Sequence, residues 1–222
     1  VYGITKFLPT YFGFNFEEEI KNLNKVFEYI KKRKRVGVVI SGIKIETKID
    51  LINKFLNKAE IIILGGGIAN TFLKAKGFEI GKSIYDEEYL DKVKKIYSNK
   101  ILIPFDFITQ NGYRFLGEIK KDDVILDIGN ESLKIFLDEL KKMDLVVWNG
   151  PLGKIEDKKY IKGSLNFAKE IIKMGNKKII GGGDTLKIFE KIRVKKLKNV
   201  FFSTGGGAML YYLAHENLPI FK

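Results

Sequence analysis

Five glycine-rich turns carry the residues of this chain that are best suited to chemistry. Each follows a short apolar run, and they read Ser41-Gly42-Ile43-Lys44, Gly65-Gly66-Gly67, Asn149-Gly150-Pro151-Leu152-Gly153, Gly181-Gly182-Gly183-Asp184-Thr185 and Ser203-Thr204-Gly205-Gly206-Gly207. Glycine allows the backbone to approach a ligand closely and to adopt positive φ. A helix that begins just after such a turn directs free N–H groups and the positive end of its dipole at an anion. Together the five turns predict a phosphate-binding rim on a parallel sheet.

Charged side chains lie beside three of these turns. Lys44 and Lys48 are four residues apart, a spacing that places two ammonium groups on one face near a helix start. Two cations there oppose the helix dipole and favour a bound anion, with two ordinary surface lysines as the alternative. Asp184 is either a helix N-cap or a ligand of nucleotide-bound Mg²⁺, with the Thr185 hydroxyl on phosphate. Glu156 lies just beyond the 149–153 turn and could bind ribose hydroxyls, although a lone glutamate is weak evidence for this.

The composition excludes several classes of site. The chain has no cysteine, which rules out disulfides and thiolate metal sites, and its one histidine, His215, argues against histidine-based catalysis. No apolar run reaches membrane-spanning length and no signal peptide is recognisable, which predicts a cytoplasmic protein that does not engage a membrane. There is no P-loop, and no Gly-x-Gly-x-x-Gly motif follows the first strand-like run, which disfavours a Rossmann dehydrogenase.

The net charge of +13 comes almost entirely from lysine, since only four basic residues are arginine. This bias is typical of whole-genome composition more than of a nucleic-acid-binding face, so no nucleic-acid partner is expected. The basic run at 31–35 (KKRKR) is interpreted as the solvated end of a helix, with a polyanion-binding patch as the alternative.

Short apolar runs alternate with helical patterns and must position the turns. Strands are expected at 36–40, 61–64, 101–103, 124–127, 145–148, 178–180 and 200–203, and helices at 16–34, 47–58, 68–76, 86–97, 131–142, 158–174, 184–192 and 207–214. Asn111-Gly112 predicts a type I′ hairpin appended antiparallel to the sheet. The expected fold is α/β, a three-layer α/β/α Rossmann-like domain with a mostly parallel sheet of about six or seven strands, in which ligands lie outside the carboxyl ends of the strands.

Several stretches of the sequence, taken in chain order, resemble the motifs of the phosphoglycerate kinase family. The stretch at 41–49 (SGIKIETKI) is similar to the family's Gly-Gly-Ala-Lys-Val-x-Asp-Lys-Ile segment, and later family motifs match at 65–73, 126–129, 147–153, 181–185, 203–208 and 218–219. Residues 1–35 resemble the interdomain helix region and residues 36–222 the C-terminal nucleotide-binding domain. The N-terminal domain, which holds 3-phosphoglycerate, has no counterpart in this sequence.

The resemblance implies reversible phosphoryl transfer between 1,3-bisphosphoglycerate and ADP, with Mg²⁺ and ATP or ADP bound by this half. It implies that Lys44 follows the phosphoryl group in transit while backbone N–H groups of Gly183 and Gly207 steady it, and that Asp184 binds the metal. The nucleotide-binding residues that it implies are Lys25, Gly42, Ile43, Lys44, Lys48, Gly66, Leu126, Asn149, Gly150, Leu152, Glu156, Gly182, Gly183, Asp184 and Thr185.

Several positions depart from the family pattern. Ser41 and Ile43 add bulk where the family has Gly and Ala, Thr47 replaces an Asp, Ile125 replaces a Gly near the base, and 154–155 is Lys-Ile in place of Val-Phe. We expect a monomer that is inactive without its N-terminal domain. A non-catalytic basic module for nucleotides or nucleic acid, and a nicotinamide-dependent oxidoreductase, are the alternative functions.

Overall fold

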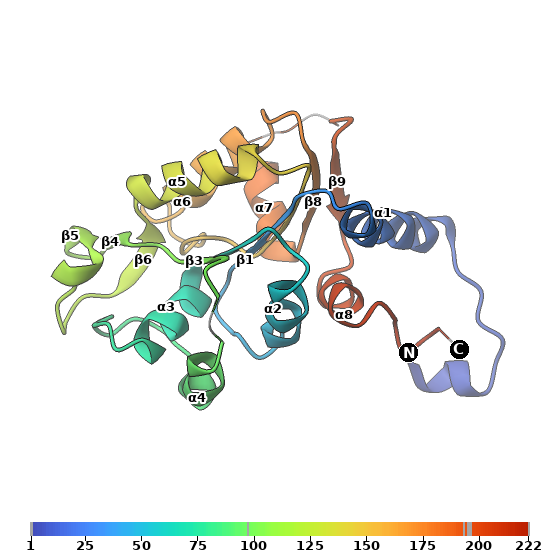
Figure 1. Cartoon of the computed structure of the whole chain (residues 1–222), viewed down its shortest axis with the longest axis horizontal. Helices are drawn as coiled ribbons and strands as arrows, with labels where there is room; N and C mark the ends of the chain where they lie inside the picture. Colours follow the sequence, from blue (N-terminus) through green and yellow to red (C-terminus); the bar gives the residue numbers. More distant parts are fainter. Residues whose placement is uncertain (1, 97, 193, 195–196, 222) are drawn as a thin grey trace.

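A six-stranded parallel sheet forms the centre of the protein (Figure 1). The computed structural model describes residues 2–96, 98–192, 194 and 197–221. Across the sheet the strands are β3 (Ile101–Leu102), β2 (Ile61–Leu64), β1 (Val36–Ile40), β7 (Leu145–Asn149), β8 (Lys177–Gly181) and β9 (Val200–Ser203). These strands are nearly continuous runs of apolar residues because helices cover both faces of the sheet.

Two layers of helices bury the two faces. One layer contains α1 (Phe14–Lys31), α2 (Ile49–Leu56), α3 (Gly66–Ala75), α4 (Leu90–Lys94) and α8 (Gly207–His215), and the other contains α5 (Asn130–Lys141), α6 (Lys162–Ile171) and α7 (Gly183–Lys191). Alternate side chains of β1 pack into two hydrophobic cores, one on each face of the sheet. Val38 and Ile40 lie in the core beneath α1, α2, α3 and α8, and Val39 lies in the core beneath α5, α6 and α7. This confirms the expected three-layer α/β/α fold.

The strands of the central sheet end in register. Ile40 pairs with both Leu64 and Asn149, Asn149 pairs with Gly181, and Gly181 pairs with Ser203. All five glycine-rich turns therefore leave the sheet at the same level of its carboxyl edge, as the sequence predicted. Three of them lead directly into a helix, at α3, α7 and α8.

A second, three-stranded antiparallel sheet lies beside the β3 end of the molecule, in the order β5-β4-β6. Its strands are β4 (Asp106–Thr109), β5 (Gly112–Phe115) and β6 (Ile125–Ile128). The prediction that 124–127 belongs to the parallel sheet is wrong, because β6 pairs antiparallel with β4. An apolar run does not by itself specify its partner, and here the preceding hairpin provides one.

The hairpin itself was predicted correctly, but its turn type was not. Thr109 pairs with Gly112, so the tip is Gln110-Asn111. A type I′ turn needs positive φ at both tip residues. Among the described non-glycine residues only Arg33 and Glu216 have positive φ, whereas Gly112 itself has φ 111°. The glycine therefore follows the turn instead of forming it.

Other boundaries moved by a few residues, and two helices are much shorter than expected. The region 158–174 contains α6 from Lys162 only, after a long turn, and 86–97 contains the short 3₁₀ segment Glu87–Tyr89 followed by α4, with position 97 outside the described residues. Further 3₁₀ segments lie at Tyr2–Lys6 and Leu116–Glu118. Within the described ranges, no helix is both long and apolar enough to cross a membrane. The division at residue 35 stays a prediction.

Two buried carboxylates hold the small sheet to the helices. Asp127 of β6 accepts hydrogen bonds from the N–H groups of Gly163, at 2.7 Å, and Ile128, at 2.9 Å. Asp106 of β4 accepts from the N–H of Ser132 at 2.8 Å, in the first turn of α5. Burial raises the pKa of Asp127 to about 7, although its two N–H donors act in the opposite direction. Keeping the buried Asp127 carboxylate ionised therefore costs folding free energy at neutral pH. Asp127 and Asp106 are together called the anchor of the small sheet.

Asp127→Asn should flatten part of the pH dependence of stability. Because the folded pKa lies above the unfolded value of 3.8, the folded state holds more protons between these values, and its stability falls as pH rises toward 7. This group contributes a slope of at most about 1.4 kcal/mol per pH unit. Urea unfolding at pH 5, 6, 7 and 8 measures it. Asp122→Asn, at an exposed position, is the control and should keep the wild-type slope; equal slopes for the wild type and Asp127→Asn would contradict the assignment.

Candidate functional site

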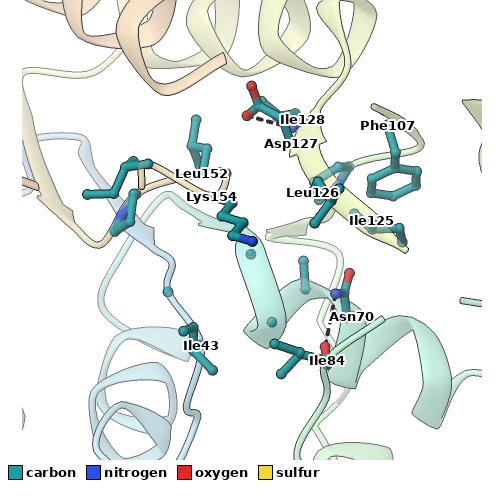
Figure 2. Close-up of a pocket in the computed structure, with 18 of the residues that line it drawn as sticks. Ile43, Asn70, Ile84, Phe107, Ile125, Leu126, Asp127, Ile128, Leu152 and Lys154 are labelled. Carbon is teal, nitrogen blue, oxygen red and sulfur yellow. Dashed lines mark hydrogen bonds between the residues drawn. The ribbon is translucent and has the colours of Figure 1, made fainter. Parts of the chain in front are cut away.

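A cavity of about 450 Å³ lies at the carboxyl edge of the sheet, between the start of α3, the small sheet and the turn that follows β7 (Figure 2). Its volume is in the range of sites for small organic ligands. The wall is largely apolar, and its apolar side chains include Ile43, Ile84, Phe107, Ile125, Leu126 and Leu152. The cavity therefore suits a flat apolar group such as a nucleobase.

The structure brings seven of the expected nucleotide-binding residues to this cavity. They are Gly42, Ile43, Gly66, Leu126, Leu152, Glu156 and Asp184. The other expected residues are not part of its wall: Lys25, Lys44, Lys48, Asn149, Gly150, Gly182, Gly183, Thr185 and Gly207. Most of these nine lie on or beside the turns of the sheet edge, whereas Lys25 lies on α1 and donates to Asn22 Oδ1 at 2.6 Å.

Several wall residues were missed by sequence reasoning. Asn70, Ile84, Phe107 and Asp127 all line the cavity. Asn70 and Asp127 lie within stretches that resemble family motifs, and their polarity in otherwise apolar surroundings was the available signal. Ile84 and Phe107 come from a loop and the small sheet, and no sequence pattern connects them to the glycine turns.

The start of α3 packs directly on the turn after β1. A Cβ placed on Gly67 would lie 2.6 Å from the Ile43 carbonyl oxygen, and one on Gly66 would lie 2.9 Å from that of Gly42. Gly66 also has φ 58°, a conformation that favours glycine. The two turns therefore form one continuous floor beneath the cavity, and larger residues at 66 and 67 would separate them.

Hydrogen bonds tie the next turns together. The Gly150 N–H donates to Thr185 Oγ1 at 2.7 Å, and Asn149 Nδ2 donates to the Gly181 carbonyl at 3.0 Å. Trp148 Nε1 donates to the Gly150 carbonyl at 2.7 Å. Thr185 and Asn149 are buried and make contacts that position the backbone. Their expected contacts with phosphate stay predictions.

Lys48 is the half-buried cation of the site. Its Nζ donates to the Ser41 carbonyl oxygen. Burial lowers the pKa of Lys48 to about 8, and the nearby Asp184 carboxylate opposes this shift. The helical spacing expected for Lys44 and Lys48 is wrong, because α2 begins only at Ile49. Lys44 is instead exposed on the preceding turn.

The sheet edge next to Asp184 is open. Apart from adjacent backbone, no atom of the described residues lies within 4 Å of where a Cβ would stand on Gly183, Gly206 or Gly207, at the starts of α7 and α8. The Asp184 side chain is 58% exposed and pairs with Lys187 at 2.8 Å. The starts of α7 and α8 are therefore open at this edge of the sheet, and helix starts of this kind favour anionic ligands.

The donor set around Asp184 fits a cation that shares its ligands with phosphate. Among the described residues, no group of three or more His, Cys, Asp or Glu side chains could hold a metal. Mg²⁺ commonly takes one or two protein carboxylates and fills its remaining positions with phosphate oxygens and water. Asp184 could supply such a carboxylate at the cavity wall.

Comparisons with known proteins identify the family to which the chain is similar. Residues 1–216 match the family described as "Phosphoglycerate kinase". The phosphoglycerate kinase of Wigglesworthia glossinidia brevipalpis is 39% identical over 98% of this chain and 57% of its own length. The crystal structure of phosphoglycerate kinase from Pyrococcus horikoshii OT3 matches with a TM-score of 0.82 at 26% identity, over 98% of this chain and 58% of that one.

The structure of phosphoglycerate kinase from Coxiella burnetii matches with a TM-score of 0.80 at 29% identity, over 89% of this chain and 56% of that one. The chain thus spans between half and two thirds of the length of each of these proteins. The matched region includes the central sheet, the small sheet and all five glycine-rich turns. The chain therefore belongs to the phosphoglycerate kinase family.

Proposed function

We propose that this chain is the C-terminal, nucleotide-binding half of a phosphoglycerate kinase and takes part in reversible phosphoryl transfer between 1,3-bisphosphoglycerate and ADP. One observation carries the proposal: the in-register strand ends place an apolar cavity directly beside an open, glycine-lined edge that holds Lys48 and Asp184. A nucleotide has the matching asymmetry, with an apolar base at one end and phosphates at the other.

The site would bind the nucleotide in three parts. The base enters the apolar cavity, where Leu126 and Leu152 contact it from two elements. Glu156, exposed at the cavity wall, accepts hydrogen bonds from the ribose hydroxyls. The phosphates extend along the turns toward the starts of α7 and α8, where N–H groups are available.

Phosphoryl transfer asks the protein mainly to position the reactants and to neutralise charge on the phosphate oxygens. The N–H groups of Gly183 and Gly207 would donate to the transferring group, and Lys48 would hold the nucleotide phosphates. Lys44 is exposed and has a flexible side chain, so its ammonium could follow the moving phosphoryl group. Mg²⁺, held by Asp184 and the phosphates, would neutralise part of the phosphate charge.

The second substrate requires surfaces beyond those described. Side chains of the N-terminal segment support this: Phe7, Tyr11 and Phe14 are 84%, 90% and 90% exposed. Large apolar side chains gathered in one exposed segment are typical of an interaction surface. We infer that in a complete phosphoglycerate kinase this segment contacts the part that binds 3-phosphoglycerate.

Calorimetric titration with Mg·ADP tests the proposal. Asp184→Asn should weaken binding by about tenfold because a charged ligand of the metal is lost, and the difference should vanish when Mg²⁺ is omitted. Asp138→Asn is a matched control, since Asp138 also pairs with a lysine three residues on at 2.8 Å but lies on α5, outside the cavity wall. Absence of binding to the wild-type chain, or equal weakening by both variants, would overturn the proposal.

Nucleotide affinity should also decrease as the pH rises above 8. Bound phosphates favour protonated Lys48, so above its free pKa of about 8 binding must take up a proton. The dissociation constant should then rise by up to about tenfold per pH unit. Titrations with ADP between pH 7 and 9.5 measure this rise, and Lys48→Met should bind more weakly with little pH dependence.

Lys134→Met, at an exposed position on α5, should retain the wild-type pH profile. A pH profile that is the same in wild type and Lys48→Met would remove Lys48 from the phosphate site.

A further inference from the structure

Asn70 carries an acceptor that is unpaired within the described part of the chain. Its side chain, on α3, is 3% exposed and lines the cavity. The amide nitrogen donates to the Ile84 carbonyl oxygen at 3.0 Å, whereas Oδ1 is buried and has no hydrogen-bond partner among the residues that the structure describes. Such groups are rare in folded proteins because an unpaired buried polar atom loses its hydrogen bonds to water.

The position of this oxygen is set by its neighbour. A carbonyl can only accept a hydrogen bond, so the Ile84 oxygen requires the Asn70 amide to present its nitrogen on that side. The amide oxygen must then face the other way, and in Figure 2 it points away from Ile84, on the side of Ile125. The neighbouring wall residues there, Ile125 and Phe107, have no side-chain donor to offer.

The other polar or charged side chains of the wall are either hydrogen-bonded within the protein or exposed. Both carboxylate oxygens of Asp127 accept hydrogen bonds from backbone N–H groups. Lys154, Glu156 and Asp184 are exposed. Of the four buried side-chain atoms without a hydrogen-bond partner among the described residues, only Asn70 Oδ1 belongs to a residue of the cavity wall. Among the described residues, the wall therefore presents one unpaired buried side-chain acceptor within apolar surroundings.

We propose that Asn70 determines base specificity, with its Oδ1 accepting a hydrogen bond from the exocyclic amino group of a 6-aminopurine. This inference rests on the proposed nucleotide site and adds a residue that selects the base. A 6-oxopurine presents an acceptor at the same position, so two oxygens would face each other without a proton between them. A site with a buried polar group discriminates strongly against an analogue that cannot satisfy it.

The experiment compares ADP with inosine 5′-diphosphate. At position 6 of the purine, ADP has an amino group and inosine 5′-diphosphate has an oxygen. Isothermal titration of the full chain with each Mg·nucleotide gives the ratio of the two dissociation constants. The wild type should favour ADP by about tenfold. Asn70→Leu, which removes the acceptor at similar volume, should reduce the preference to within about twofold, mainly through loss of ADP affinity.

Thr71→Val is the matched control for loosening of the loop at 84–86, which both Asn70 and Thr71 hold by a hydrogen bond. The Thr71 hydroxyl lies on the same helix and accepts from the Asp86 N–H, near Ile84, but Thr71 is not part of the cavity wall. This variant should weaken both nucleotides equally and keep the wild-type ratio, and thermal unfolding checks that each variant is folded. Should Asn70→Leu fail to fold, Asn70→Ala provides the second test: it removes the acceptor without placing a new polar group against the Ile84 carbonyl, and it should likewise reduce the preference for ADP to within about twofold.

The outcomes separate the two proposals. Suppose that the wild type binds ADP but binds inosine 5′-diphosphate equally well, or that Asn70→Leu leaves the ratio of the two dissociation constants unchanged. The proposed role of Asn70 in base specificity is then wrong, whereas the nucleotide site stands. In that case Oδ1 is satisfied by water or by adjustment of the side chain. If the wild type binds neither nucleotide, the proposed function fails and the role of Asn70 fails with it.

Discussion

The register of the parallel sheet is the constraint on which the site depends. Five neighbouring strands, β2, β1, β7, β8 and β9, end in one row of paired residues, from Leu64 through Ile40, Asn149 and Gly181 to Ser203. Because side chains alternate between faces with a period of two, a slip of one residue in any strand would turn its apolar side chains toward the wrong layer. The packing of the two cores therefore also aligns the turns, and the site follows from the same interactions that stabilise the fold.

Around this row the backbone is packed so closely that glycine is required at some points. A Cβ on Gly150 would lie 1.8 Å from the Ser41 carbonyl oxygen, and Gly150 has φ 96°. Such contacts bring carbonyl and N–H groups of separate turns into one surface. Two ionisable groups close to this surface pay a desolvation cost when charged: burial lowers the pKa of Lys48 to about 8 and raises that of Asp127 to about 7. An anionic ligand would relieve the first of these costs, whereas the second belongs to the anchor of the small sheet.

Much of this arrangement could be predicted from the sequence because its signals are local. Apolar runs followed by glycines mark the strand ends, and the motifs at 41–49 and 181–185 point to the family. The run at 124–127 was assigned to the parallel sheet because the pairing of β6 with β4 is a tertiary property that an apolar run does not encode. Lys44 and Lys48 were expected to share one helical face near a helix start, whereas α2 begins only at Ile49, since spacing alone does not show where a helix starts. Asn70 was missed because its unpaired oxygen becomes apparent only when its neighbours are known.

The central claim is that one ligand contacts several turns of the sheet edge at once. Backbone ¹H–¹⁵N chemical shifts of the labelled chain, recorded with and without Mg·ADP, test it most directly. The account predicts that the largest changes fall on the turns at 42–43, 66–67, 150–153 and 182–185, together with Leu126 in the small sheet. Changes confined to the basic run at 31–35, or to a single turn, would contradict it, because the strand ends would then not form one binding surface.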